Sequence, residues 1–139
     1  PRTIEAWEAL PECDDLIAQG RAMLVYQEHQ VARICEHAYK VAWPEGEILA
    51  CNTLVLQSEV GNALAKRAPE PLRTALLWYL DEMGQVRCSL RSIEGGADVS
   101  ALAKKFGGGG HARAAGFTLK ASASPLSSRF QLDRVGMGL

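Results

Sequence analysis

The sequence has no long hydrophobic run, few aromatic residues and no large excess of either charge. Its apolar runs, such as Ile48–Leu56 and Thr74–Leu80, are the size of strands, far short of the roughly 20 residues that span a membrane. Aromatic residues make up only 6% of the 139, so the core has to be built mainly from Leu, Val, Ile and Ala. With 47% apolar and 22% charged residues, the chain has the composition of one globular domain and not of a disordered segment.

The four cysteines form no metal-binding or redox motif. Cys13, Cys35, Cys51 and Cys88 are far apart and include no Cys-x-x-Cys pair, which excludes the spacing of a zinc site or a dithiol motif. We expect free, mostly buried thiols in a reducing compartment, which indicates the cytoplasm.

The net charge of −1 hides an uneven distribution along the chain. Residues 1–84 carry seven Lys and Arg against thirteen Asp and Glu, a net of −6, whereas residues 85–120 carry six against two, a net of +4. A local basic region in an acidic protein suits a small polyanion better than a long duplex, which needs an extended basic surface. An uneven scatter of surface charge is the alternative explanation.

The N-terminal third is dominated by a helical repeat. The chain begins with Pro and has neither an initiator Met nor a signal-peptide pattern, so we expect a piece of a longer protein. From an Asp14 or Asp15 cap, Ile17, Leu24, Val31 and Ala38 recur at heptad spacing and predict one long amphipathic helix to about Lys40. We therefore divide the chain into a leader with a linker helix (1–43), a domain (44–121) and a C-terminal tail of uncertain structure (122–139).

The remaining pattern predicts an α/β domain. Its expected elements are a buried strand at Glu47–Thr53, a helix at Ser58–Arg67, a hairpin of Thr74–Asp81 and Gln85–Ser92, a helix after the cap Asp98, and a strand at Phe117–Leu119. This order predicts a mixed sheet of about four to five strands with flanking helices, preceded by the long helix. Within Gln85–Ser92, strand alternation separates Val86, Cys88 and Leu90 on one face from Arg87, Ser89 and Arg91 on the other.

The sharpest local signal is the run Gly107–Gly110 followed by His111. Glycine tolerates positive φ and lets backbone N–H groups approach a ligand, and a concave run of such amides binds anions. No Gly-Lys-Ser/Thr follows, so the run is not a nucleotide P-loop. A helix C-cap is the alternative, although a single glycine suffices for a cap. Lys104 and Lys105, just before the run, are either solvated helix charges or phosphate ligands.

These residues carry a resemblance to a known family. SLRS at Ser89–Ser92 and DVSALAKKFGGGGHARAAGF at Asp98–Phe117 closely resemble the DHH-associated C-terminal domain of DHH-family phosphoesterases. That family includes nano-RNase/pAp-phosphatase, RecJ-like, cyclic-dinucleotide phosphodiesterase and exopolyphosphatase-related enzymes. SEVGNALA at Ser58–Ala65 is similar to the oligoribonuclease-like branch.

The resemblance implies a division of labour between two domains. An N-terminal DHH domain, absent from this sequence, would hold two divalent metals, Mn²⁺ or Mg²⁺, and the associated domain would close over the cleft and grip the terminal nucleotide or phosphate. The matching residues are Arg91, Gly108, Gly109, Gly110 and His111, with Ser89 a weaker candidate and Asn62 weaker still. The expected partners are a short single-stranded oligonucleotide, a nucleotide or polyphosphate, the DHH domain of the same chain, and a second copy in a homodimer.

The chain departs from the whole family pattern in one respect. No Asp-His-His and no Asp-x-Asp occurs in the 139 residues, so we expect no metal ligand and no catalytic residue here, and a chain that binds but does not hydrolyse. Two other functions stay open: a polyphosphate hydrolase domain, and a non-catalytic RNA-binding module like the C-terminal domain of alanyl-tRNA synthetase. In the latter Arg-Pro-Asp follows the glycines, so His111 favours the phosphoesterases.

Overall fold

The computed structural model describes residues 3–8 and 13–120, which divide into two units on either side of the Gln30–Val31 bond. The first unit holds α1 (Ile4–Glu8) and most of α2 (Cys13–Cys35), and the second holds the last turn of α2 and every later element. The tail assigned to residues 122–139 lies outside the described residues. No helix in the described ranges is both long and apolar enough to cross a membrane.

The predicted long helix is confirmed, but it ends earlier than its heptad pattern predicts. α2 begins with Asp14 and Asp15 in its first turn and stops at Cys35, not near Lys40. The chain then turns into β1 (Tyr39–Trp43), which pairs antiparallel with β2 (Gly46–Asn52). Ala38 fits the heptad by spacing alone, since it packs against the core from the turn after the helix.

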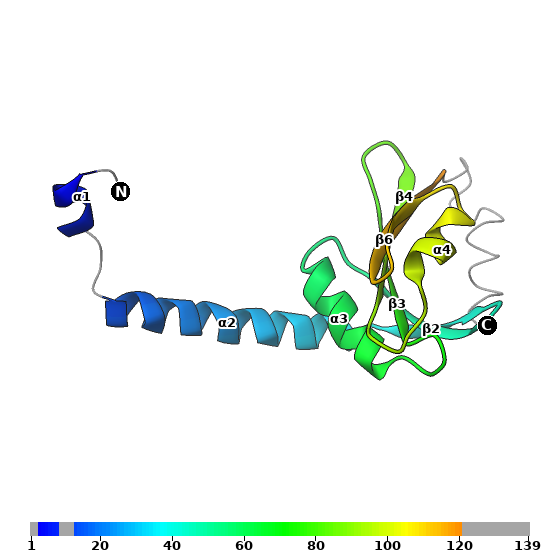
Figure 1. Ribbon diagram of the computed structural model, residues 1–139, viewed down its shortest axis with the longest axis horizontal. Coiled ribbons are helices and arrows are strands. Elements are labelled where there is room, and N and C mark those ends of the chain that lie inside the picture. The colour runs from blue at the N-terminus through cyan, green and yellow to red at the C-terminus, as the bar shows by residue number, and fades with distance from the viewer. Residues whose placement is uncertain (1–2, 9–12, 121–139) are drawn as a thin grey trace. The chain divides into compact units, whose positions relative to one another are not determined.

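The second unit is built on a mixed sheet of six strands, which confirms the predicted α/β class (Figure 1). The strand order is β1-β2-β3-β4-β6-β5; only β2 and β3 are parallel. The other strands are β3 (Thr74–Leu80), β4 (Gln85–Ser92), β5 (Gly109–His111) and β6 (Ala114–Lys120). The predicted hairpin is confirmed as β3 and β4, whereas β1 and β5 were not predicted and take the sheet beyond four to five strands.

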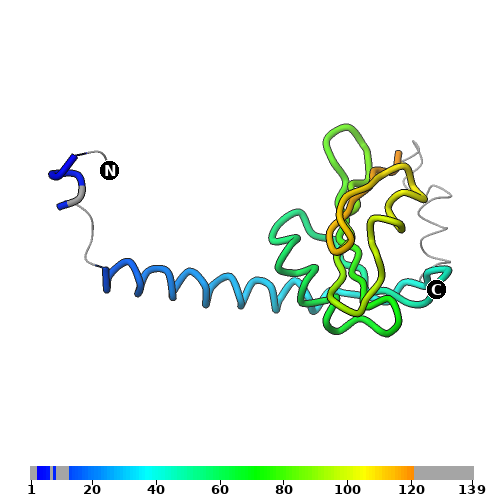
Figure 2. Tube along the Cα trace, viewed as in Figure 1, coloured from blue at the N-terminus to red at the C-terminus, as the bar shows by residue number. Residues whose placement is uncertain are grey.

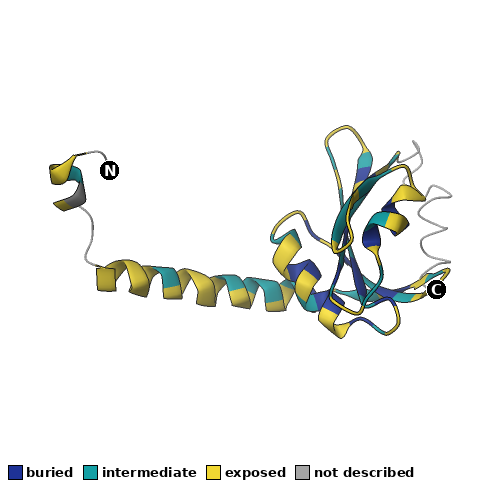
Figure 3. Cartoon of the chain, in the orientation of Figure 1, coloured by how far each residue is buried: buried dark blue, intermediate teal, exposed yellow. Residues whose placement is uncertain are grey.

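Helices cover the two faces of this sheet separately. α3 (Gln57–Arg67) and the last turn of α2 lie on one face, where Val60, Leu64 and Leu77 are fully buried. α4 (Val99–Lys104) lies on the other face, over Leu90 and Phe117 (Figure 1). The buried residues accordingly concentrate in the strands and on the inward sides of α3 and α4 (Figure 3).

Local capping places the ends of these helices. The Asp98 carboxylate accepts hydrogen bonds from the backbone N–H groups of Ser100 and Ala101, so the predicted N-cap of α4 is confirmed. α3 starts differently: Leu56 has a left-handed conformation, with φ of 53°, and provides no side-chain cap. A left-handed leucine is costly, by about 1–2 kcal/mol, and the surrounding structure has to hold it.

Candidate functional site

Strand pairing brings the predicted site residues onto one sheet face. The chain runs from α4 through the glycines into β5 and returns as β6, which lies along β4 (Figure 2). Directly paired residues of neighbouring strands point to the same face. Two rows therefore cross the three strands on the α3 face: Arg91, Ala114 and His111 in one, and Ser89, Gly116 and Gly109 in the next. We call these six positions the polar strip.

The middle strand of the polar strip, β6, carries only small residues. Ala114 and Gly116, on β6, carry at most a methyl group, so no long side chain of β6 stands between Arg91 of β4 and His111 of β5. Two strand spacings separate the backbones of β4 and β5 by roughly 10 Å. This spacing suits a phosphate group with part of its nucleoside.

Arg91 is the best-defined cation of the strip. Its Nη2 donates to the Ser58 hydroxyl at 3.1 Å, while its Nε–H is buried with no hydrogen-bond partner among the described residues. A buried donor left unpaired costs about 1–3 kcal/mol. The stem of Arg91 lies against Gly61 of α3, where a Cβ would stand 2.5 Å from Arg91 Cγ and 2.9 Å from Leu77 Cδ2. Glycine is required at this close approach of α3 to β4.

Ser89 is held by a residue that the sequence did not single out. Its hydroxyl donates to Gln57 Oε1 at 3.1 Å, and Gln57 Nε2 donates in turn to the Thr53 carbonyl at 2.9 Å. Gln57 and Ser58 form the first turn of α3, so the helix start contributes two polar side chains to this face. The motif match begins at Ser58, one residue too late to include Gln57. Asn62, the weakest predicted candidate, is exposed on α3.

The first two glycines of the run end α4. Gly107 has φ of +80°; its N–H donates to the Lys104 carbonyl, and the N–H of Gly108 donates to the Ala103 carbonyl. This bond pair is the Schellman helix ending. Gly108 also passes close to β6, where a Cβ would lie 2.0 Å from the Gly116 carbonyl oxygen. The helix-cap explanation therefore accounts for Gly107, and a close approach accounts for Gly108.

The last two glycines and His111 form the edge strand β5. Gly110 pairs with Ala115 and so belongs to the α4 face, away from the polar strip. Gly109 lies on the strip without a positive φ, and a Cβ there would meet nothing within 4 Å. His111 is exposed beside it. Of the four glycines, Gly109 alone has neither a positive φ nor a crowded Cβ position, which leaves it as the one open to a ligand.

A polar pocket adjoins the strip toward the β3–β4 turn. Its lining residues on the α3 face come from four elements and the glycine loop, and include Gln57, Tyr79, Arg87, Ser89, Gly108, Gly116 and Thr118. Arg87 Nε donates to Asp81 Oδ2 at 2.7 Å, and its Nη1 donates to Thr118 Oγ1 at 3.4 Å. The backbone N–H of Gln85, and then Arg87, lower the pKa of Asp81, so its carboxylate stays charged.

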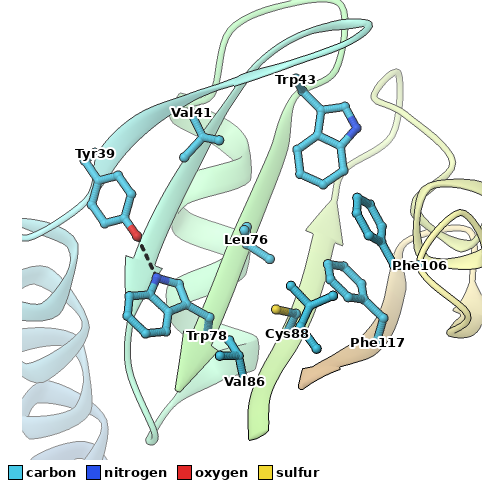
Figure 4. Close-up of a pocket in the computed structure, with 10 residues that line it drawn as sticks. Tyr39, Val41, Trp43, Leu76, Trp78, Val86, Cys88, Phe106 and Phe117 are labelled. Carbon is cyan, nitrogen blue, oxygen red and sulfur yellow. Dashed lines mark hydrogen bonds between the residues drawn. The ribbon is translucent and has the colours of Figure 1, made fainter. Parts of the chain in front are cut away.

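A second pocket, on the α4 face, is aromatic and has different chemistry. Trp43, Phe106 and Phe117 gather at one end of it, with the Phe106 and Phe117 rings stacked at 4.6 Å (Figure 4). At the other end Trp78 Nε1 donates to the Tyr39 hydroxyl at 2.6 Å. Among the described residues no charged side chain lines this pocket, so they offer nothing to neutralise a phosphate.

Part of the basic region is committed to the fold. Arg113 Nη1 donates to the carbonyls of Gly96 and Ala97 at 3.1 Å and thereby fixes the loop before α4. Lys105 is paired with Glu45, whereas Lys104 is exposed. The cations left on the α3 face of β4 are Arg87 and Arg91. The net charge of residues 85–120 therefore overstates the cationic surface.

The described residues do not provide a metal centre. Among them, no three His, Cys, Asp or Glu side chains gather in a way that could hold an ion. None of the four cysteines forms a disulfide, and Cys13 is exposed while Cys35, Cys51 and Cys88 are buried, which confirms the prediction of mostly buried thiols. Burial raises the pKa of the Cys35 and Cys51 thiols, which makes them poor ligands.

Comparison with known proteins identifies the class. Residues 51–129, more than half of the chain, match the family model of the DHHA1 domain. Over 80 residues the chain is 40% identical to oligoribonuclease NrnB of Bacillus subtilis (strain 168), a match that covers 56% of this chain and 19% of NrnB. The chain therefore belongs to the DHHA1 family, the DHH-associated domain of DHH-family phosphoesterases.

Two solved structures share the fold. An uncharacterized protein from Helicobacter pylori G27 matches with a TM-score of 0.54 and 18% identity, covering 79% of this chain and 30% of that one. The pGpG-specific phosphodiesterase PggH from Vibrio cholerae matches with a TM-score of 0.51 and 12% identity, covering 96% and 44%. The chain thus spans about a fifth of NrnB and less than half of either solved chain.

The contact between Gly61 and Arg91 gives a stability prediction. Gly61→Ala should lower the free energy of unfolding by about 1–3 kcal/mol, because the added methyl overlaps the Arg91 stem and Leu77. Urea unfolding measures the change. In an Arg91→Ala background the loss should shrink, since Cγ is gone.

Gly20→Ala is the matched control. It lies in α2 with no atom within 4 Å of the added methyl, and should raise stability by up to about 1 kcal/mol. An equal loss for Gly61→Ala in both Arg91 backgrounds would show that Arg91 is not the group displaced.

Proposed function

We propose that this chain is the substrate-binding domain of a metal-dependent DHH-family phosphoesterase and that it holds a phosphate of a short oligonucleotide or nucleotide on the polar strip. Arg91 supplies the charge and His111 a further hydrogen bond, Ser89 would donate once its hydroxyl proton turns from Gln57 to the phosphate, and Gly109 allows the edge-strand backbone to approach the ligand. The oligoribonuclease named among the relatives supports an oligonucleotide as the substrate class.

The observation that carries this proposal is the buried, unpartnered Nε–H of Arg91. Buried side-chain donors that serve structure alone have hydrogen-bond partners in the large majority of cases, whereas this donor has none among the described residues. Ser58 is the partner of Arg91 Nη2, and the position of Arg91 on β4 lies in the same row as His111. A phosphate accepts two parallel N–H bonds from one arginine, and a shift of the Arg91 side chain would turn the buried Nε–H toward such a ligand.

The described part of this chain does not fit the metal ions that a DHH-family phosphoesterase uses. Because the described residues contain no cluster of metal-ligating side chains, we assign Mn²⁺ or Mg²⁺ to a DHH domain outside these 139 residues. The residues present here would bind and orient the substrate, which lowers the barrier by fixing the reacting phosphate in place.

The polar pocket favours a nucleotide over bare polyphosphate. Gln57, Thr118 and Tyr79 line it with uncharged hydrogen-bonding groups, which match ribose hydroxyls and base edges better than a continuous chain of anions. A polyphosphate site would need further cations in their place.

The first prediction from this proposal concerns Arg91. Arg91→Ala should weaken binding of the 5′-phosphorylated dinucleotide pApA by about 10- to 100-fold, the scale of a charged hydrogen bond of roughly 1.5–3 kcal/mol. Arg91→Lys should recover only part of the affinity, because lysine lacks the planar fork. NMR titration of the 139-residue chain measures these affinities into the millimolar range. Unchanged affinity in Arg91→Ala would remove the basis of the proposal.

The second prediction separates the glycine and histidine roles. His111→Ala and Gly109→Ala should each weaken pApA binding, the former by about tenfold or more, while leaving the melting temperature within a degree or two, because both positions are open. Gly107→Ala should instead cost about 1 kcal/mol of stability, because it forces a side chain into a left-handed cap. Lost stability in His111→Ala with unchanged binding would make His111 a structural residue.

The third prediction concerns activity. The chain with Mn²⁺ should not hydrolyse pApA or 3′-phosphoadenosine 5′-phosphate, because it has no described group to hold the ion. Product formation is followed by chromatography with and without EDTA. EDTA-sensitive turnover that co-purifies with the chain, and is lost in Arg91→Ala, would contradict the assignment of the metal to another domain.

A further inference from the structure

Arg87 is a second fixed cation on the same face of β4. Strand alternation places Arg87, Ser89 and Arg91 on the α3 face, with about 13 Å between the two arginine backbones at 3.3 Å per residue. Arg91 is anchored toward α3 by Ser58, whereas Arg87 is anchored toward the hairpin end by Asp81. One phosphate group is too small to bridge two guanidinium groups held in this way.

The contacts of Arg87 orient its guanidinium group but occupy only some of its N–H donors. Asp81 Oδ2 takes the Nε–H, and Thr118 Oγ1 takes one Nη1 hydrogen at a long 3.4 Å. Arginine has five N–H donors, so the remaining Nη hydrogens stay available. The Arg87 side chain is 48% exposed, while that of Asp81 is 6% exposed and accepts from the backbone N–H groups of Met83 and Gln85. The β3–β4 turn thus holds the Asp81 carboxylate in place, and this carboxylate orients the Arg87 guanidinium.

The sheet surface between the two arginines is open and is flanked by polar groups that could bind a nucleoside. Ser89 and Gly116 pair across β4 and β6 midway along the face, and glycine at the second position leaves the sheet surface open there. The polar pocket that Arg87 lines also contains Gln57, whose carbonyl oxygen already meets Ser89. A ribose or base above Gly116 would find hydrogen-bond partners on both sides.

We propose that Arg87 is a second phosphate-binding residue, so that the site takes linear oligonucleotides with one phosphate at Arg91 and another at Arg87, the nucleoside between them lying over Ser89 and Gly116. This inference rests on the proposed function, since it takes Arg91 as the first phosphate contact. The spacing of the two arginines on β4 then determines which ligand length binds best. A mononucleotide contacts one arginine, and a dinucleotide or longer chain contacts both.

The experiment compares ligands that differ only in length. Affinities of pA, pApA and pApApA for the 139-residue chain are measured by NMR titration for wild type, Arg87→Gln and Arg91→Ala. Arg87→Gln should leave pA binding within twofold and weaken pApA and pApApA by about tenfold, whereas Arg91→Ala should weaken all three. The salt dependence of pApApA binding should lose about one unit of slope in Arg87→Gln.

Two controls guard against a change of fold. Lys66→Gln removes an exposed cation from the last turn of α3 and should alter none of the affinities. Arg87→Lys keeps a charge opposite Asp81 and should give intermediate affinity for pApA, with a melting temperature near that of wild type. If Arg87→Gln alone loses stability, the lysine variant still decides the question.

The outcomes separate the two proposals. Equal weakening of pA and pApA in both Arg87 variants would show that Arg87 acts only by supporting the hairpin and would overturn the inference. Unchanged pApA and pApApA affinity in the Arg87 variants, with a loss in Arg91→Ala, would overturn it while the proposed function stands. No effect of Arg91→Ala on any ligand would overturn the proposed function and this inference with it.

Discussion

The antiparallel pairing of β4 with β6 is the constraint on which the candidate site depends. Its register sets Ser89 opposite Gly116 and Arg91 opposite Ala114, and β5 then sets Gly109 and His111 in the same two rows. Because side chains alternate between the faces of a strand, a shift of one residue would send His111 to the α4 side while Arg91 stayed with α3. Backbone hydrogen bonds thus join two motifs that lie about twenty residues apart in the chain.

The same register explains why small residues cluster between Gly107 and Gly116. Gly108 has to pass the carbonyl of Gly116, and Gly116 would place a Cβ 2.9 Å from the Cys88 carbonyl. Close backbone packing and an open ligand surface make the same demand for glycine, so a glycine-rich motif can serve both. What distinguishes the two uses is the surroundings of each glycine: Gly108 is crowded and Gly109 is open.

Sequence reasoning found the elements with strong periodicity and missed those without it. The β3–β4 hairpin and the Asp98 cap follow from local chemistry and were predicted. β1 was hidden because Ala38 extends a heptad by chance, and β5 because three residues of Gly-Gly-His carry no strand propensity. Gln57 and the role of Gly61 depend on how α3 meets β4, a tertiary contact that no local pattern encodes.

Pre-positioning of the cations is what would make this face selective. Free arginine side chains lose much of their rotamer entropy on binding, whereas Arg91 is already held by Ser58 and the surface of Gly61, and Arg87 by Asp81. The side-chain entropy of these two arginines is therefore lost when the protein folds and not when the ligand binds. The hairpin turn orders Asp81, the partner of Arg87, and α3, which starts after the αL residue Leu56, provides the partner of Arg91. On this proposal, a ligand gains the second phosphate contact only if the distance between its phosphates matches the spacing that β4 has already fixed. Charge alone would bind any polyanion; charge at two fixed points along one strand selects by length.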